Sequence, residues 1–250
     1  PVNKDTELMP LMRLQYRGID DNKRQVFLFD NVRDGSGKQF DLRVATGMYG
    51  SSRDVTALGL GCEDARDVYE NWRHALAHMY EPKIVNRAPV QEEVYSGSRL
   101  KEFPVTRLPS PVEEPGFSCG IRVTAPFITK DPETGTRNVG MYSGHFRGEQ
   151  KLIAGIARTH HAMLYHHPKA VRRKEPLPVA IVLGCLPDIV YVSAANLPYG
   201  IDEIAVAGGI RRRPVDMVPC KTIPLEVPAD AEIVIEGEIS IDAMERGEPF

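Results

Sequence analysis

The residues with the clearest potential for chemistry are an asparagine, two adjacent histidines and a glutamate, which lie far apart in the 250-residue chain. Asn138 follows a turn-forming sequence, His160 and His161 lie in a segment that we expect to be helical, and Glu203 precedes an apolar stretch. An amide oxygen, an imidazole nitrogen and a carboxylate suit Mg²⁺ or Mn²⁺, with phosphate or water as further ligands. Together they suggest a divalent metal site.

Each of these residues also has an ordinary structural interpretation. Asn138 could complete the turn before its strand. A helical histidine is more often a surface residue or a satisfied core residue. Glu203 could be a first-turn carboxylate stabilised by the helix dipole. Only the combination of the four residues favours a metal.

Other chemical signals are weak or absent from the sequence. The sequence at 207–209 lacks the glycine spacing of a phosphate-binding loop, and the arginine run at 211–213 is more typical of a solvated turn. The sequence contains no serine elbow, no H-E-x-x-H and no paired thiol, so hydrolase and zinc-protease chemistry has no support.

Composition limits the classes of protein that fit. The net charge of -3 argues against a nucleic-acid partner, and four well-separated cysteines indicate neither a zinc ribbon nor a disulfide framework. We expect reduced thiols in a cytoplasmic protein. The longest apolar run, at 178–186, is too short to span a membrane. Because the chain begins at Pro1 and ends at Phe250 soon after a strand-like run, we also expect a fragment.

The elements expected to position these residues change in character along the chain. Helices are predicted at 7–17 and 63–79, the latter with one apolar stripe of Ala65, Val68, Trp72, Leu76 and Met79, and it is expected to be the longest helix. Between these helices we expect a buried strand at 26–29 and another at 40–46. Repeated prolines after residue 88 place a domain boundary near residues 90–115, so we assign residues 1–100 to one domain and 101–250 to a second.

The second domain has a β-rich pattern. Strands are predicted at 120–128, 138–146, 177–183 and 233–241, and one helix at 151–165. We therefore expect an α+β protein, with a small N-terminal α/β domain followed by a barrel-like β domain.

Several ordered segments resemble the UbiD-like decarboxylase family over nearly the whole chain. These segments are 29–32, 50–53 with 57–59, 88–92, 134–142, 178–184 and 231–237. The resemblance implies a split β-barrel that binds prenylated FMN, preceded by the α/β domain. It also implies a C-terminal domain, absent from this chain, through which a homo-oligomer or a larger complex would form.

The same resemblance implies roles for individual residues. Asn138, His161 and Glu203 match the family's ligands for Mn²⁺ or Mg²⁺, with Fe²⁺ as an alternative, and the metal would bridge the protein to the flavin phosphate. A K⁺ near that phosphate would lie around Ser193 and Ala195, with Glu203 shared. The cofactor-binding set is completed by the backbone of Gly140 and Met141, which would lie along the flavin, and by His160.

Two departures from the family leave the catalytic residues open. Most members have arginine where this chain has Ser143, and the family's Glu-Gly-Pro-Phe-Gly-Glu is not intact at Gly247-Glu248-Pro249-Phe250. In a regular strand Ser143, His145 and Arg147 share one face. His145 could then supply a proton or Arg147 could hold a carboxylate, and either could equally be a surface residue. We take Ser143, His145 and Glu248 as the candidate catalytic residues.

The function implied by the resemblance is reversible decarboxylation of an aromatic or α,β-unsaturated carboxylic acid, or of its coenzyme A thioester, with CO₂ as the second partner. A flavin prenyltransferase would supply the cofactor, which carries the difficult chemistry. Two alternatives remain. The first is a non-catalytic flavin- and metal-binding subunit of a carboxylase complex, which Ser143 favours. The second is a redox flavoprotein, which is less supported because the sequence contains no nicotinamide-binding fingerprint.

Overall fold

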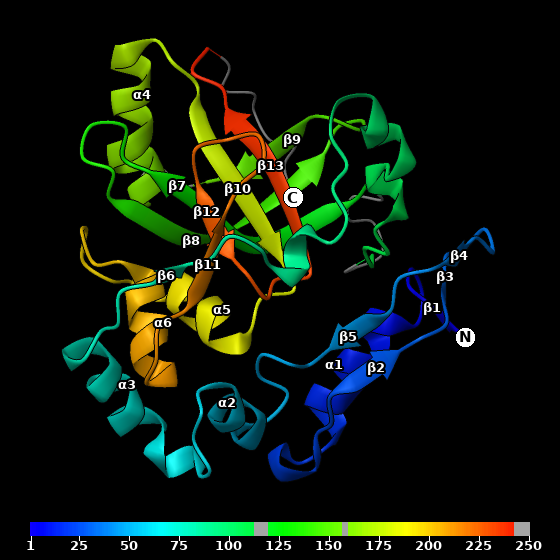
Figure 1. Ribbon diagram of the computed structural model, residues 1–250. Coiled ribbons are helices and arrows are strands. Elements are labelled where there is room, and N and C mark those ends of the chain that lie inside the picture. The colour runs from blue at the N-terminus through cyan, green and yellow to red at the C-terminus, as the bar shows by residue number, and fades with distance from the viewer. Residues whose placement is uncertain (113–119, 157–159, 243–250) are drawn as a thin grey trace.

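The computed structural model describes residues 1–112, 120–156 and 160–242. These residues form a mixed α/β structure whose largest element is a curled, antiparallel five-stranded sheet (Figure 1). In spatial order its strands are β13 (Ile233–Ile239), β10 (Leu177–Leu183), β7 (Arg122–Lys130), β8 (Arg137–Phe146) and β9 (Leu152–Gly155). The four strands that the sequence predicted in this region are all present, with ends shifted by two residues at most.

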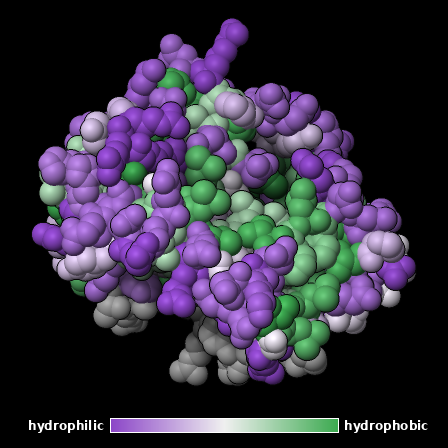
Figure 2. Space-filling model, turned by 90° about the horizontal axis from the view of Figure 1, so that it is seen from below, coloured by the Kyte–Doolittle hydropathy of each residue, from purple (hydrophilic) through white to green (hydrophobic). Residues whose placement is uncertain are grey.

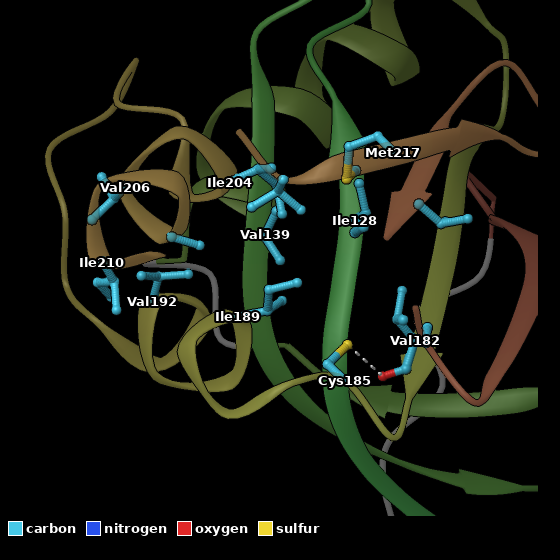
Figure 3. Close-up of a cluster of buried hydrophobic side chains, with 14 of the residues drawn as sticks. Ile128, Val139, Val182, Cys185, Ile189, Val192, Ile204, Val206, Ile210 and Met217 are labelled. Carbon is cyan, nitrogen blue, oxygen red and sulfur yellow. Dashed lines mark hydrogen bonds between the residues drawn. The ribbon is translucent and has the colours of Figure 1, made fainter. Parts of the chain in front are cut away.

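Helices cover both faces of this sheet. One face packs against α5 (Pro187–Ala194) and α6 (Glu203–Arg211), and the other against a π-helical turn, η6 (Ala162–His166), which continues into α4 (His167–Arg173). The central strand β10 is apolar on both faces because both are buried. Figure 3 shows side chains of the first face, including Val139, Ile189 and Ile204, pointing toward one another.

A second layer packs on α6. It consists of α3 (Val68–Ala77) and a three-stranded sheet of β12 (Glu226–Pro228), β11 (Asp216–Pro219) and β6 (Lys83–Ile84). A Cβ atom at Gly209 would lie 2.6 Å from the carbonyl oxygen of Ala75. Glycines are therefore needed in α6 to let the backbone of α3 approach closely.

The N-terminal residues form a smaller unit with its own core of Val2, Leu8, Val32 and Phe40. Its elements are β1 (Val2–Asn3), α1 (Leu8–Gly18), β2 (Phe27–Phe29), β3 (Val32–Arg33), β4 (Gln39–Phe40) and β5 (Val44–Thr46). The helix predicted at 7–17 is confirmed. The single strand predicted at 40–46 is wrong, since β4 pairs with β3 and β5 pairs with β2. The strand at 26–29 is not buried, because it lies in a two-stranded sheet and Leu28 is 61% exposed.

Short helices connect these parts. They are α2 (Arg53–Gly59) and the 3₁₀ turns η1 (Asp21–Lys23), η2 (Ala65–Asp67), η3 (Pro89–Gln91), η4 (Gly97–Glu102) and η5 (Val105–Arg107). The main core includes residues from α2 and α3 as well as from the five-stranded sheet. The domain division at residue 100 stays a prediction.

The helix predicted at 63–79 is shorter in the structure and buries a different face. It consists of η2 followed by α3, and at 10 residues α3 is shorter than α1, which has 11. Leu76 and Met79 are exposed, whereas Asn71 and Ala75 are buried. Asn71 is drawn inward because its Nδ2 donates to the carbonyl oxygen of Leu60 at 2.6 Å. The apolar stripe predicted for this helix is therefore wrong in its C-terminal half.

The helix predicted at 151–165 is also wrong. Residues 152–155 form β9, which pairs with β8, and the helix begins only at His161. Residues 152–155 pair with residues 143–146 of β8. The helical spacing of the apolar residues does not indicate this pairing.

The surface includes a hydrophobic band (Figure 2), and the described cysteines are free. The face seen from below carries a hollowed hydrophobic band among hydrophilic side chains (Figure 2). Within the described ranges, none of the helices combines the length and apolar composition that crossing a membrane requires. Cys62, Cys185 and Cys220 are free thiols, as expected, and Cys119 lies outside the described residues.

Candidate functional site

Asn138 is the second residue of β8 and is 4% exposed. The turn before it is held by Asp131, whose Oδ1 accepts hydrogen bonds from the backbone N–H groups of Glu133 and Thr134 at 2.9 and 3.2 Å. β8 pairs with β9 only from Ser143 to Phe146. Among the described residues, the stretch of β8 that begins with Asn138 therefore pairs with β7 on one side and has no strand partner at its other edge.

Glu203 fills part of that edge. It is the first residue of α6, it is 4% exposed, and its Oε2 accepts a hydrogen bond from the backbone N–H of Val139 at 2.9 Å. Burial raises the pKa of this carboxyl group to about 7, although the bond from Val139 opposes the rise. The helix dipole favours its anionic form. Glu203 is thus a buried carboxylate that bonds to the residue after Asn138. The protein compensates its negative charge only in part.

A partly buried salt bridge fixes α6 to the beginning of β8. Arg137, which precedes Asn138, pairs with Asp202, which precedes Glu203. Arg137 also contacts Glu226 at 3.0 Å, and its side chain is only 10% exposed. The residue before each of the two candidate ligands is therefore held by the same ion pair. The sequence offered no signal for this contact, because its partners are 65 residues apart.

The two histidines lie at the beginning of a helix, and not in its middle as the sequence predicted. His161 precedes the π-helical turn η6, a distortion that is common at functional sites. Its ring lies 5.7 Å from that of Tyr165 and 5.6 Å from that of Tyr199, and burial lowers its pKa. A lowered pKa favours the neutral imidazole, the form that binds metals. His160 is exposed.

Tyr142 connects His160 to Asn138. Its ring stacks on that of His160 with 5.2 Å between centroids, and its hydroxyl lies 3.5 Å from Nδ2 of Asn138. The side chain folds back over Gly140, where a Cβ atom would lie 2.2 Å from the hydroxyl. Glycine at 140 is therefore required by this arrangement. Sequence reasoning did not single out Tyr142, because its contacts with His160 and Asn138 form only in the folded chain.

The structure brings two of the three predicted ligands together directly, Asn138 and Glu203. Asn138 and Glu203 meet through Val139, whereas His161 faces Tyr199, four residues before Glu203. The described residues contain no group of three or more His, Cys, Asp or Glu side chains placed to hold a metal ion. The proposed set has only two such residues and relies on an amide and on oxygens from outside the protein. It stays a prediction.

The remaining cofactor candidates lie in and after α5 and in β8. Ser193 is in the last turn of α5, where its hydroxyl donates to the carbonyl oxygen of Val190 at 2.7 Å, and Ala195 follows the helix in an extended conformation. α5 packs beside α6, the helix that begins with Glu203. Met141 follows Gly140 in β8 and is half-buried.

Ser143 and His145 lie on the other face of β8 from Asn138, because the pairing of β8 with β7 is continuous and side chains alternate. Oγ of Ser143 lies 2.8 Å from Oγ1 of Thr124, and the Arg122 guanidinium is 3.5 Å away. Sequence reasoning missed these two neighbours, since they come from β7.

The expected alternation holds for Ser143 and His145 within β8. It is wrong for Arg147, which lies beyond the end of the strand at Phe146, where the chain turns. Glu248 lies outside the described residues.

Comparisons with known proteins give one consistent relationship. Residues 83–250 match the model of the family described as UbiD, 3-octaprenyl-4-hydroxybenzoate carboxy-lyase Rift-related domain. A protein of Aquifex aeolicus without an assigned function is 33% identical over 86% of this chain and 46% of its own length. Anhydromevalonate phosphate decarboxylase of Methanothermobacter thermautotrophicus is 29% identical over 85% of this chain and 48% of its own length.

Solved structures agree with this relationship. The UbiD-class enzyme HmfF from Pelotomaculum thermopropionicum, in complex with FMN, covers 100% of this chain and 52% of its own length, with a TM-score of 0.85 and 29% identity. An evolved dimeric form of that enzyme, in complex with prFMN, has the same TM-score and identity. The chain spans about half the length of each of these proteins.

Proposed function

This chain belongs to the UbiD family, and from that premise we propose that it forms the flavin-binding part of a carboxy-lyase that adds or removes CO₂ on an aromatic or α,β-unsaturated acid. The observation that carries the proposal is the meeting of Asn138 and Glu203 at the open edge of β8. Both are buried, and Glu203 is bonded to the backbone of the residue after Asn138.

The chemistry of the donors fits a divalent cation. Asn138 and Glu203 offer oxygen, and His161 offers an imidazole whose lowered pKa keeps it neutral. Burial raises the pKa of Glu203 because its negative charge lacks full compensation, and a bound Mn²⁺ or Mg²⁺, or Fe²⁺, would supply that compensation. A K⁺ would be held by Ser193 and Ala195 together with Glu203.

The protein would position the flavin and control its surroundings. Asn138, His161 and Glu203 would hold the metal against the flavin phosphate, with His160 nearby and the backbone of Gly140 and Met141 along the ring system. When bound, prenylated FMN would supply the electron sink for breaking or forming the bond to the carboxyl group.

The proton and the substrate carboxylate would be handled by other residues. We propose that an imidazole nitrogen of His145 holds the proton, that Ser143 leaves space beside the ring, and that Glu248 takes part from the C-terminal residues. A split-barrel arrangement, a flavin prenyltransferase as the source of the cofactor, and a homo-oligomer or complex formed through a further domain belong to the same proposal. A free acid or its coenzyme A thioester would be the substrate.

A non-catalytic role as a flavin- and metal-binding subunit is the second candidate. Ser143 favours it, because a short neutral side chain contacts Thr124 at this position and cannot form an ion pair with a carboxylate. Turnover of any aromatic or unsaturated acid by the flavin-loaded protein would exclude this candidate.

The test is to measure metal and flavin together in protein produced with a flavin prenyltransferase. Glu203→Gln keeps the shape of the side chain and removes its charge, so it should lower the content of both. Asp188→Asn is the matched control, since Asp188 is equally buried at 4% exposure but pairs with Arg211. Full flavin and unchanged metal in Glu203→Gln would show that the site lies elsewhere.

A further inference from the structure

Asp131 is a buried carboxylate that the proposed chemistry does not use. It lies directly after β7, its side chain is fully buried, and its Oδ1 holds the turn that leads to β8. Its Oδ2 accepts a hydrogen bond from the hydroxyl of Tyr199 and lies 2.5 Å from Nζ of Lys169 in α4. One side chain thus joins the turn before β8 to two other elements.

Tyr199 is the second member of this contact. Its ring packs against three aromatic side chains of the helix that begins at His161: Tyr165 at 4.0 Å, His161 at 5.6 Å and His166 at 5.9 Å between centroids. The ring of His161 meets it edge-on, with 86° between the planes. This orientation of the imidazole therefore depends on where Tyr199 is held.

Tyr199 also lies close to Glu203 in the chain, four residues before it. Tyr199 lies three residues before Asp202, whose side chain accepts a hydrogen bond from the N–H of Ile204 and caps α6. A turn closed by the bond from the N–H of Ile201 to the carbonyl oxygen of Pro198 separates them. Any shift of Tyr199 is passed along this short segment to Glu203.

The pair Asp131–Tyr199 therefore touches the three elements that carry the three candidate ligands. The turn after Asp131 leads to Asn138, the helix beside the tyrosine ring begins with His161, and the segment after Tyr199 leads to Glu203. We infer that Tyr199 and Asp131 are positioning residues, which hold His161 and Glu203 at the separation that a divalent metal requires. The inference rests on the proposed metal site and adds residues that do not contact the metal.

The physical basis is that metal ligands must be oriented as well as present. Groups that orient ligands typically affect metal affinity by about 10-fold to 100-fold, although they lie outside the coordination shell. Without the hydroxyl of Tyr199, the ring can rotate, and both His161 and the segment before α6 lose a fixed neighbour.

The test uses Tyr199→Phe, which removes one oxygen atom and keeps the ring. The 250-residue chain is loaded with FMN, Mn²⁺ is titrated, and free Mn²⁺ is followed by electron paramagnetic resonance, with Tm measured on the same samples. We expect Mn²⁺ affinity to fall about 10-fold. Tyr49→Phe is the matched control, because its hydroxyl also donates one hydrogen bond, to the carbonyl oxygen of Cys185 at 3.0 Å. It should change Tm by a similar amount and leave Mn²⁺ affinity unchanged.

Glu203→Gln separates this inference from the proposed site. Loss of Mn²⁺ affinity in Glu203→Gln with none in Tyr199→Phe would overturn the positioning role and leave the site in place. Equal losses of affinity in Tyr199→Phe and Tyr49→Phe would also overturn it, since a general loss of stability would then explain both. Unchanged affinity in all three variants would remove the site, and the positioning role with it.

Discussion

His166 should make the folded chain sensitive to mild acid. The side chain is fully buried, and its Nδ1 lies 2.9 Å from Oγ1 of Thr129. Nε2 has no hydrogen-bond partner in the part of the chain that the structure describes. We assign the proton of the neutral ring to Nδ1, because a bare acceptor at Nε2 costs less than a buried N–H without an acceptor. Protonation would add an N–H at Nε2, which has no acceptor among the described residues, and a charge that burial disfavours.

The magnitude follows from the pKa of the group. Burial lowers the pKa of His166 to about 4, with Lys169 and His161 acting in the same direction and Asp131 opposing them. An unfolded histidine titrates near 6.5, so between these values the unfolded chain binds a proton that the folded chain does not. The free energy of unfolding is therefore highest above pH 6.5 and falls as pH decreases toward about 4. The difference between the two pKa values lowers the free energy of unfolding by about 3 kcal/mol when His166 is fully protonated and by about 2 kcal/mol near pH 5.

The assay is urea unfolding followed by fluorescence of the single tryptophan, Trp72, at several pH values from about 7.5 to 4.5. Other groups also titrate in this range, so the informative quantity is the difference between the wild type and His166→Gln. That difference should shrink by about 2 kcal/mol between pH 7.5 and 5, because glutamine cannot take up the proton.

A difference between the wild type and His166→Gln that stays constant from pH 7.5 to 5 would refute this reasoning. It would mean that the folded chain binds a proton at His166 as easily as the unfolded chain does. The imidazole would then have an acceptor or access to water that its burial denies.

Three further predictions concern packing and chemistry. Gly209→Ala should lower the free energy of unfolding by about 1–3 kcal/mol, because the new methyl group meets Ala75 in α3. Gly237→Ala should not lower it, because a Cβ atom there has no heavy atom within 4 Å. Urea unfolding of both variants would check this prediction. Ser143→Arg should reduce turnover more than flavin content, and a gain of activity on simple aromatic acids would instead make residue 143 a determinant of substrate choice. Protein produced without a flavin prenyltransferase should bind FMN and show no turnover, and equal activity of the two preparations in a CO₂ release assay would contradict the proposed chemistry.

Four strands of the five-stranded sheet were predicted, whereas the helices expected at 63–79 and 151–165 differ from those in the structure. The strands at 122–130 and 177–183 have apolar runs bounded by turn residues, which is a local signal. The prediction for 151–165 failed because the pairing of β9 with β8 is not local, and the leucines and isoleucines of this segment also occur at helical spacing. The stripe of α3 failed because a polar side chain, Asn71, is satisfied by a backbone carbonyl and takes a buried place.

The candidate site shows the same limit. Asn138 and Glu203 were placed correctly, at the beginning of a strand and of a helix, since turn residues and proline mark both positions. The contacts that unite them, Glu203 with the backbone of Val139 and Arg137 with Asp202, join residues more than 60 positions apart. No local pattern encodes such contacts, so the resemblance to a family had to supply the grouping.

The bond from the N–H of Val139 to Glu203 also bears on the solubility of the protein. Among the described residues, the carboxylate is the group that bonds to this edge of β8 at Val139, in the place that a carbonyl oxygen of a neighbouring strand would take. Open edges of this kind pair readily with other chains and promote aggregation. Glutamine at 203 retains an acceptor oxygen and should keep the edge closed, whereas alanine would leave the N–H of Val139 free to recruit a second molecule. Loss of the acceptor at residue 203 is therefore expected to appear first as self-association.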